Sequence, residues 1–340
     1  MGISILRAGL QDTVQDLGRN GYAHLGISSS GAADAFSLRI GNLLVGNYGN
    51  AAGIEVTLVG GKYKFTADTF IALSGSEFQA DLNGVSFPFH RGKYVQKDEI
   101  LTIGPTQNGA RCYLAVRGGI DVPDLLSAKT THVVSGLGGY KGRSLQKGDT
   151  LSIGNLEEVT QVISIKVKLE IKRNIIRINN GLQSKWFDGN SWSSFTNNTY
   201  FVSESSSRMG IRLSGESINS TRGHEIITEG IPLGAIQIPG GGQPIISFVE
   251  HQTTGGYPKI ANVINSDLCK VGQLKPVDQI QFQSVTLEEA ETLKFEQEAF
   301  IKSLKNNHAE YHRYFDHFNY VYGCFDPDWS MGQQKDPFYF

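Results

Sequence analysis

The chain has 340 residues, and its 31 Lys and Arg against 33 Asp and Glu leave a net charge of −2 at pH 7. This balance excludes the strongly basic surface that is typical of proteins binding nucleic acid or anionic membranes. The 40 glycines make up about 12 per cent of the chain, compared with roughly 7 per cent in an average protein. Combined with short apolar runs between turn signals, this excess predicts a mainly β protein rather than an α/β one.

The three cysteines (Cys112, Cys269 and Cys324) are far apart and odd in number. They predict neither a disulfide framework nor a zinc site, which favours a reducing compartment. The N-terminus lacks the apolar length of a signal peptide, and no run of about 18 apolar residues is present. We therefore expect a cytoplasmic protein with no membrane or nucleic-acid partner.

The first predicted elements are a loop, a helix and a series of strands. Residues 11–34 are polar and glycine-spaced, which predicts a loop region rather than a strand. Asp34 then precedes apolar residues at helical spacing, so a helix is expected with Asp34 as N-cap and Gly46-Asn47 as its end. The strands that follow have the spacing of a barrel or sandwich. They are predicted at Ile54–Val59, Tyr63–Phe65, Phe70–Ser74, Glu77–Leu82, Ile100–Ile103 and Cys112–Val116.

A short pattern recurs along the chain. Residues 96–104 (QKDEILTIG) return fifty positions later as residues 146–154 (QKGDTLSIG), with a looser copy at 275–282 (KPVDQIQF). Each copy is a polar turn with an aspartate that leads into a short alternating strand. The copies favour similar β units, with a duplicated domain as one explanation and chance similarity of turn–strand units as the other.

The charged and β-branched alternation of residues 154–177 predicts the passage from a first domain to a second. We expect a first domain at 1–165, a second at 166–285, and a C-terminal helix and tail at 286–340. Thr286 and Glu289 form a capping-box pattern that opens a helix reaching about Lys305.

The tail is rich in aromatic residues. His308 and His312 lie four apart and could ligate a metal ion if the segment is helical. No carboxylate or thiol pattern joins them, which favours a packed or exposed tail, so we expect no metal site.

The stretch from Glu225 to Lys259 carries the most distinctive pattern. Two strand-like runs, Gly234–Pro239 and Pro244–Val249, flank three consecutive glycines, which predicts a tight turn or a loop that approaches another backbone closely. The polar, glycine-rich residues 252–259 follow (QTTGGYPK). Such a segment at a strand end can hold polar side chains against a ligand, although a hairpin followed by a structural turn explains it equally well.

Several familiar chemical motifs are missing from the sequence. It contains no Gly-x-x-x-x-Gly-Lys-Ser/Thr phosphate loop, no Gly-x-Gly-x-x-Gly and no Gly-x-Ser-x-Gly elbow. The glycines of Gly136–Arg143 could present amides to an anion, but an ordinary flexible loop is favoured for them.

What remains is a set of polar clusters between glycines, at 15–19, 30–34 and 206–212, besides the stretch described above. Arginine suits carboxylates and phosphates, and a Gln amide suits a lactam, which needs a donor and an acceptor side by side. Asp16 and Arg19 can equally form a structural pair with Asp16 capping a turn, and Arg208 and Arg212 can simply brace the fold.

Seven blocks in order support a resemblance to a known family. They are residues 14–34 (VQDLGRNGYAHLGISSSGAAD), 54–61 (IEVTLVGG), 113–123 (YLAVRGGIDVP), 136–149 (GLGGYKGRSLQKGD), 206–215 (SSRMGIRLSG), 229–245 (EGIPLGAIQIPGGGQPI) and 252–260 (QTTGGYPKI). Together they resemble the biotin-dependent carboxyltransferase-type family that includes allophanate hydrolase subunit 2, KipA and the C subunit of bacterial 5-oxoprolinase. The resemblance covers residues 1 to about 285.

The resemblance implies two tandem cyclophilin-like β-barrel domains. It also implies a KipI-like partner (allophanate hydrolase subunit 1 type), with the working site where the two chains meet. In urea carboxylase relatives both parts are fused and transfer a carboxyl group from carboxybiotin to urea. In 5-oxoprolinase they open 5-oxo-L-proline to L-glutamate with ATP, together with a LamB/YcsF-like third subunit.

Lactam opening is the activity that fits this chain best, because it requires the fewest missing parts. A biotin carrier needs a lysine beside methionine, and Met1, Met209 and Met331 have none. We therefore expect no biotin on this chain, and ATP only through the complex. The alternatives are a KipA-type regulator that antagonises a KipI-like histidine-kinase inhibitor, or a carboxyltransferase subunit acting on urea- or allophanate-type substrates.

The chemistry needs donors for a developing negative charge and a base for water, once the amide has been activated by phosphorylation of its oxygen. The resulting hypothesis places the catalytic roles on four residues, with Arg208 and Lys259 as anion contacts and Asp16 or Glu250 as base or orienter. The residues expected to bind substrate are Arg19, Ser30, Asp34, Gln237, Gln243, Gln252, Thr253 and Tyr257.

Three positions depart from the family pattern. Ser207 stands where an Asp is common, Glu250-His251 where Asp-Arg is frequent, and Lys129 where an Arg is usual. Each departure makes a charged position near the expected site less strictly defined, so specificity could differ or catalysis could depend mainly on the partner.

Overall fold

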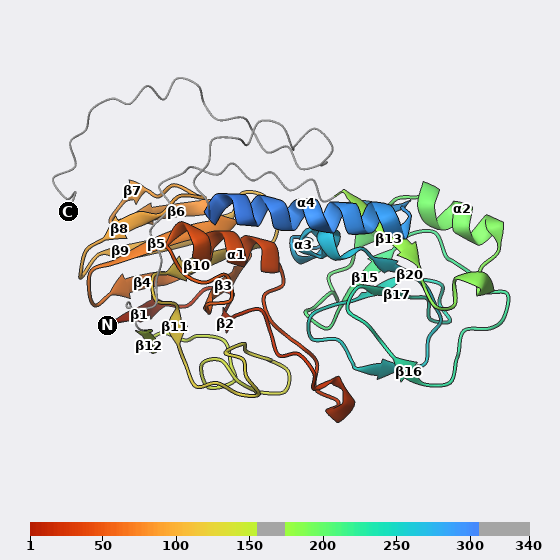
Figure 1. Cartoon of the computed structure of the whole chain (residues 1–340), viewed down its shortest axis with the longest axis horizontal. Helices are drawn as coiled ribbons and strands as arrows, with labels where there is room; N and C mark the ends of the chain where they lie inside the picture. The colour runs from red at the N-terminus through yellow and green to blue at the C-terminus, as the bar shows by residue number, and fades with distance from the viewer. Residues whose placement is uncertain (155–173, 306–340) are drawn as a thin grey trace, which may run out of the picture.

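A computed structural model describes residues 1–154 and 174–305, which form two β units joined by helices (Figure 1). In the N-terminal unit, residues 2–153, two sheets enclose one apolar core. The larger sheet has the order β11 (Ile120–Asp121), β12 (Thr150–Ile153), β1 (Gly2–Arg7), β4 (Lys62–Phe65), β9 (Ile100–Thr106), β6 (Phe78–Leu82) and β7 (Val85–Ser86). The smaller has the order β2 (Gln11–Gln15), β3 (Gly53–Thr57), β10 (Arg111–Val116), β5 (Thr69–Gly75) and β8 (Lys93–Val95).

The C-terminal unit, residues 175–284, is a closed barrel around a second core. All its neighbouring strands are antiparallel except β13 and β21, which run parallel. The barrel order is β13 (Ile175–Asn180), β20 (Lys259–Val263), β17 (Ala235–Gln237), β18 (Ile245–Ser247), β15 (Gly210–Ser214), β14 (Tyr200–Val202) and β21 (Gln279–Ser284). A two-stranded ribbon of β16 (Glu229–Gly230) and β19 (Thr254–Gly255) lies beside it.

Helices cover and connect the two units. The α-helices are α1 (Ala35–Leu44), α2 (Gly189–Asn197), α3 (Leu268–Gly272) and α4 (Leu287–Lys305), and single 3₁₀ turns are η1 (Ala23–Leu25), η2 (Ser184–Trp186) and η3 (Asn265–Asp267). Figure 1 shows α4 lying along α1 and α3. Its apolar residues Phe300, Ile301 and Leu304 share a buried cluster with α1 and with Cys269 of α3, so α4 packs on both units.

The repeated pattern corresponds to one repeated turn. In each copy a carboxylate accepts a hydrogen bond from the backbone amide three residues before it: Glu99 from Gln96, Asp149 from Gln146, and Asp278 from Lys275. The third residue of each copy has a positive φ, as the i+2 position of a type II turn requires. These residues are Asp98 (φ 71°), Gly148 (φ 92°) and Val277 (φ 66°), and the turns lead into β9, β12 and β21.

Most sequence predictions about the elements are confirmed, including the mainly β fold. Asp34 caps α1 by accepting from the Ser37 amide, and Thr286 and Glu289 exchange the two capping-box bonds at the start of α4. β17 and β18 form the predicted hairpin, whose glycine turn closes with a bond from the Gly242 amide to the Pro239 carbonyl. Within the described residues, no helix has both the length and the apolar character needed to cross a membrane.

One prediction about the elements is wrong. Residues 11–15 form strand β2, paired with β3, rather than loop. The polar composition was misleading because the polar groups are buried and hydrogen-bonded: the Tyr63 hydroxyl donates to Asp12, and Gln15 donates to Thr13 and to the Thr131 carbonyl. The proposed domain boundary at residue 165 and the histidines His308 and His312 lie outside the described residues.

Candidate functional site

Arg208 forms the centre of a buried polar network between the two units. It lies in the loop before β15, and its side chain is almost completely shielded from solvent. Nη1 lies 2.6 Å from Glu55 Oε1, Nε lies 2.5 Å from Glu250 Oε1, and Nη2 donates to the Gly31 carbonyl over 2.6 Å. Burial by itself would lower the pKa of Arg208, but the two carboxylates outweigh it and raise that pKa. The charged Arg208 side chain therefore links the two units.

Glu55 extends this network to the start of α1. Its Oε2 accepts from the Ala33 amide and from the Tyr113 hydroxyl, each over 2.8 Å. The same hydroxyl accepts from the Asp34 amide over 2.7 Å. Burial raises the pKa of Asp34, whose carboxylate accepts from Ser37 and from the Gln273 side chain of the C-terminal unit. Asp34 thus caps a helix and joins the units, with both carboxylate oxygens occupied.

Two tight loops cross next to Arg208. One carries Asp16 and Arg19, and the other carries Ser30 and Gly31, whose carbonyl accepts from Arg208. Arg19 Nη2 donates to the Thr130 carbonyl over 2.8 Å, while Nε and Nη1 have no hydrogen-bond partner within residues 1–154 and 174–305. Burial lowers the pKa of Arg19, against the opposing charges of Asp16 and Glu250. Asp16 accepts from the amides of Gly18 (2.8 Å) and Lys129 (2.6 Å), which makes it a turn cap.

This crossing depends on glycine and on one strained residue. A Cβ on Gly31, whose φ is +91°, would lie 2.8 Å from the Gly18 amide nitrogen, so only glycine fits there. Ser30 has a φ of 53° and donates to the Thr131 carbonyl. Of the predicted site residues, the structure therefore brings six together in one buried region: Asp16, Arg19, Ser30, Asp34, Arg208 and Glu250.

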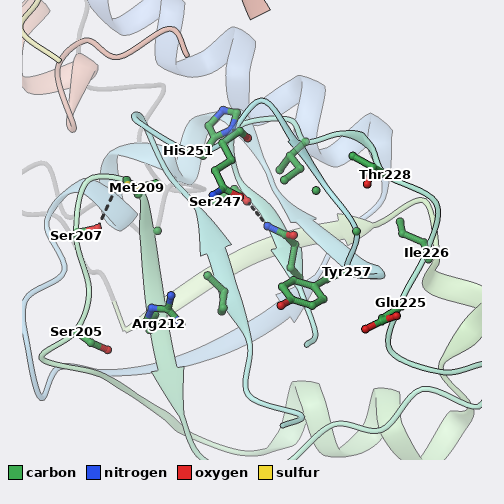
Figure 2. Close-up of a pocket in the computed structure, with 17 residues that line it drawn as sticks. Ser205, Ser207, Met209, Arg212, Glu225, Ile226, Thr228, Ser247, His251 and Tyr257 are labelled. Carbon is green, nitrogen blue, oxygen red and sulfur yellow. Dashed lines mark hydrogen bonds between the residues drawn. The ribbon is translucent and has the colours of Figure 1, made fainter. Parts of the chain in front are cut away.

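A polar cavity of about 620 Å³ lies on the outer face of strands β15, β17 and β18 of the C-terminal barrel, and we call it the barrel cavity. Figure 2 shows Ser205, Ser207 and Arg212 on one side, with Glu225, Ile226 and Thr228 on the other and His251 and Ser247 between them. Of the predicted substrate-binding residues, Gln237, Gln252 and Tyr257 line it. Gln237 is buried, and its Nε2 donates to Ser247 Oγ over 2.9 Å, which orients the side-chain amide.

A second cavity of about 430 Å³, the seam cavity, lies between the units. Its lining includes Arg111 and Leu58 of the N-terminal unit and Arg208 and Glu250 of the C-terminal unit. Ser207 and Met209 line both cavities, so the loop that carries Arg208 is the wall between them. The ion pairs of Arg208 therefore fix the shape of both cavities.

The remaining predicted residues lie elsewhere. Lys259 is buried, with Nζ 2.7 Å from Glu229 Oε1, and this contact lowers the pKa of Glu229. Gln243 bonds to Gly215 and Ser217 and so braces a turn of the barrel. The Thr253 carbonyl accepts from the Ile231 amide next to the β16–β19 ribbon. None of these three lines either of the two cavities described above.

Sequence reasoning gave no pocket role to Arg212 and His251. It also missed four members of the network: Glu55, Tyr113, Gln273 and Arg111, the last with Nε 3.5 Å from Glu55 Oε1. A signal for two of them was present, since Glu55 and Tyr113 are polar residues inside apolar strand runs. Alternation would place such residues in solvent, but β3 and β10 are interior strands and α1 packs against β10. A charged residue in such a strand must find a buried partner, which is what Arg208 provides.

Residues 25–284 match the family described as carboxyltransferase domain, subdomains A and B, and the chain belongs to this family. Among characterised relatives, it is 38% identical to the C subunit of 5-oxoprolinase from Escherichia coli over 308 residues, covering 89% of this chain and 97% of that one. It is 34% identical to the protein of the same name from Haemophilus influenzae, again over 97% of its length.

The chain is also similar to part of much longer proteins. It is 33% identical to urea amidolyase of Saccharomyces cerevisiae, where 89% of this chain covers 18% of that protein. The crystal structure of urea amidolyase from K. lactis superposes with a TM-score of 0.82 at 31% identity, covering 89% of this chain and 20% of that one. The chain thus spans about a fifth of these multidomain relatives.

Proposed function

We propose that this chain is the C subunit of an ATP-dependent 5-oxoprolinase, which opens 5-oxo-L-proline to L-glutamate in a complex. The observation that carries the proposal is the match over 97% of the length of the Escherichia coli 5-oxoprolinase chain and 89% of this one. The partner would be a KipI-like subunit, with a LamB/YcsF-like protein as a third component. ATP would bind through the assembled complex, and the chain itself would carry no biotin.

The barrel cavity suits a small, polar, anionic lactam. Gln237 and Gln252 each offer an amide donor beside an amide acceptor, which is the pattern that pairs with a lactam. Arg212, on the cavity wall, is suited to the substrate carboxylate. Arg208, which is fully engaged with Glu55, Glu250 and Gly31, would shape the cavity rather than contact the substrate. The seam cavity lies on the opposite side of the same wall and would face the partner protein.

The test is reconstitution. This chain, a KipI-like protein and a LamB/YcsF-like protein are purified together and supplied with 5-oxo-L-proline and ATP, and L-glutamate is measured. We expect glutamate release only when all components and ATP are present. A stable three-component complex that releases no glutamate would remove the enzymatic proposal and leave a KipA-type regulatory role in front.

The structural similarity to urea amidolyase favours one second candidate, carboxyl transfer to a urea-type substrate. That activity would require a biotin carrier and a biotin carboxylase from other chains. The same purified complex, supplied with carboxybiotin and urea in place of ATP and 5-oxo-L-proline, distinguishes the two: consumption of carboxybiotin that depends on urea would favour carboxyl transfer.

A further inference from the structure

We propose that His251 is the proton-transfer residue of the barrel cavity, with Nε2 as the base that activates water. The proposal rests on the lactam-opening function proposed above and adds to it a catalytic residue. His251 lies at the turn that follows β18 and lines the cavity together with Ser247 and Gln237 (Figure 2).

A backbone contact fixes the protonation pattern of the His251 ring. Nδ1 lies 2.7 Å from the carbonyl oxygen of Gln252. A carbonyl oxygen can only accept, so Nδ1 must carry the hydrogen and donate it. In the neutral ring Nε2 then keeps its lone pair, which makes it the acceptor. The ring is held in the tautomer that a general base requires.

The surroundings of the ring keep it neutral near pH 7. Burial lowers the pKa of His251 below the ordinary histidine value, against a smaller opposing effect of the bond to Gln252. The charged side chains on the same cavity are Arg212 from β15 and Glu225 from the segment before β16. The neighbouring Glu250 is held by Arg208 through Oε1, and its Oε2 is buried. A neutral imidazole with an unprotonated Nε2 is the form that can take a proton from water.

The other candidate bases are less well placed. Asp16 has its two oxygens bound by backbone amides, and it does not line the barrel cavity. Glu250 lies behind the wall formed by the Arg208 loop and lines the seam cavity instead. Glu225 lines the barrel cavity, but its side chain is exposed to bulk solvent. His251 therefore combines access to the cavity with a fixed acceptor.

The step that His251 would perform is balanced in protons. As the water oxygen forms a bond to the carbonyl carbon of the activated lactam, one water proton passes to Nε2. When the carbon–nitrogen bond of the ring breaks, the imidazolium returns that proton to the departing nitrogen, which becomes the amine. The carbon is left as an acyl phosphate, and its hydrolysis by a second water molecule releases phosphate and the carboxylate of glutamate. His251 ends in its starting form. ATP, supplied by the proposed complex, provides the activation of the carbonyl oxygen.

The test compares His251→Gln with His224→Gln in the reconstituted complex. Glutamine keeps the polarity of histidine but cannot take up a proton, and His224 is a histidine of the same unit that does not line the cavity. We expect His251→Gln to lower kcat by about 10²–10⁴-fold with little change in KM, and to abolish the acid limb of the kcat/KM profile. His224→Gln should keep both. Full activity and an unchanged acid limb in His251→Gln overturn the proposal while leaving the proposed function intact.

A second measurement on the isolated full chain needs no turnover. Nitrogen-15 NMR of the histidine rings, assigned with His251→Gln, reports the tautomer directly. We expect an Nδ1–H, unprotonated Nε2 form of His251, with a pKa below the ordinary histidine value. An Nε2–H tautomer overturns the assignment even if the complex is active. A wild-type complex that releases no glutamate instead overturns the proposed function, and the NMR result then decides the His251 assignment alone.

Discussion

Arg208 and Glu55 belong to different β units, yet Nη1 of the first lies 2.6 Å from Oε1 of the second, and both side chains are almost fully buried. Glu55 is at the same time tied to the Ala33 amide and to Tyr113, and Arg208 to Glu250 and Gly31. Removing either side chain would leave the other as a buried charge without its partner. The pair therefore fixes how the two units meet.

Replacing Arg208 should destabilise the protein strongly. Arg208→Ala leaves Glu55 and Glu250 buried without their cation, and the loss of one partner of a buried pair costs about 3–5 kcal/mol. Arg208→Lys should recover little, because an ammonium cannot reach three acceptors with the geometry of a guanidinium. Urea unfolding gives the free energies. The matched control is the exposed Arg212→Ala, four residues away, which should change stability by less than about 0.5 kcal/mol. Equal stability of the two alanine variants would contradict the structural role of Arg208.

Asp12 should make stability depend on pH. Burial raises its pKa to about 6, against the opposing hydrogen bonds from Tyr63 and Gly9. The folded state therefore holds the proton more tightly than the unfolded state, whose Asp pKa is near 3.8. The stabilisation of the folded state that comes from protonated Asp12 is fully present below about pH 4 and is lost as the pH rises to about 6.

The measurement is the difference in unfolding free energy between wild type and Asp12→Asn at each pH from about 3.5 to 7. We expect the unfolding free energy of Asp12→Asn to increase relative to that of the wild type as the pH rises through this window. Above it, the difference should stay constant. The comparison at equal pH matters because burial lowers the pKa of His90 to about 4, which acts in the opposite direction over the same range. Exposed Asp124→Asn is the control and should show no such slope. A constant difference at every pH would refute the assignment to Asp12.

The sequence predicted the elements that rest on local chemistry. The cap at Asp34, the capping box at Thr286, the glycine hairpin and the repeated turns each need only neighbouring residues, and each is present. Strand β2 was missed because its polar side chains find partners more than fifty positions away, such as Tyr63 for Asp12. Local composition carries no record of such partners.

The same limit applies to the site. Arg208 and Glu250 were predicted as catalytic residues and Asp34 as a substrate-binding residue. The structure connects all three in one buried network through Glu55, which was not singled out. A carboxylate engaged by a buried arginine and a carboxylate free to act as base look identical in sequence. Only the contacts separate Glu250, which is paired, from the cavity residues Arg212 and His251.

Replacement of Val277 with glycine should stabilise the protein. Its φ of 66° puts a β-branched residue in the left-handed region, which costs about 1–2 kcal/mol, and its side chain is exposed and contributes little burial. The greater freedom of glycine in the unfolded chain offsets part of the gain, so Val277→Gly should add about 0.5–1 kcal/mol. Gly148→Ala, at the equivalent position of the second turn, should lose a similar amount. Thermal and urea unfolding of both variants provide the check, and a destabilised Val277→Gly would contradict the strain argument.

Helix α4 should stabilise both units through its buried face. Phe300 is 7% exposed, and its ring centroid lies 6.0 Å from that of Phe36 on α1. Phe295 on the same helix is 74% exposed. Phe300→Ala should cost about 3–5 kcal/mol in the free energy of unfolding, while Phe295→Ala should stay within about 0.5 kcal/mol of the wild type. The Arg39–Glu298 pair beside them is partly exposed and should contribute no more than about 1 kcal/mol. If α4 only rested on the surface, Phe300→Ala and Phe295→Ala would unfold at the same urea concentration. A loss confined to Phe300→Ala, with cooperative unfolding of both units retained, is the result expected of a helix that ties them together.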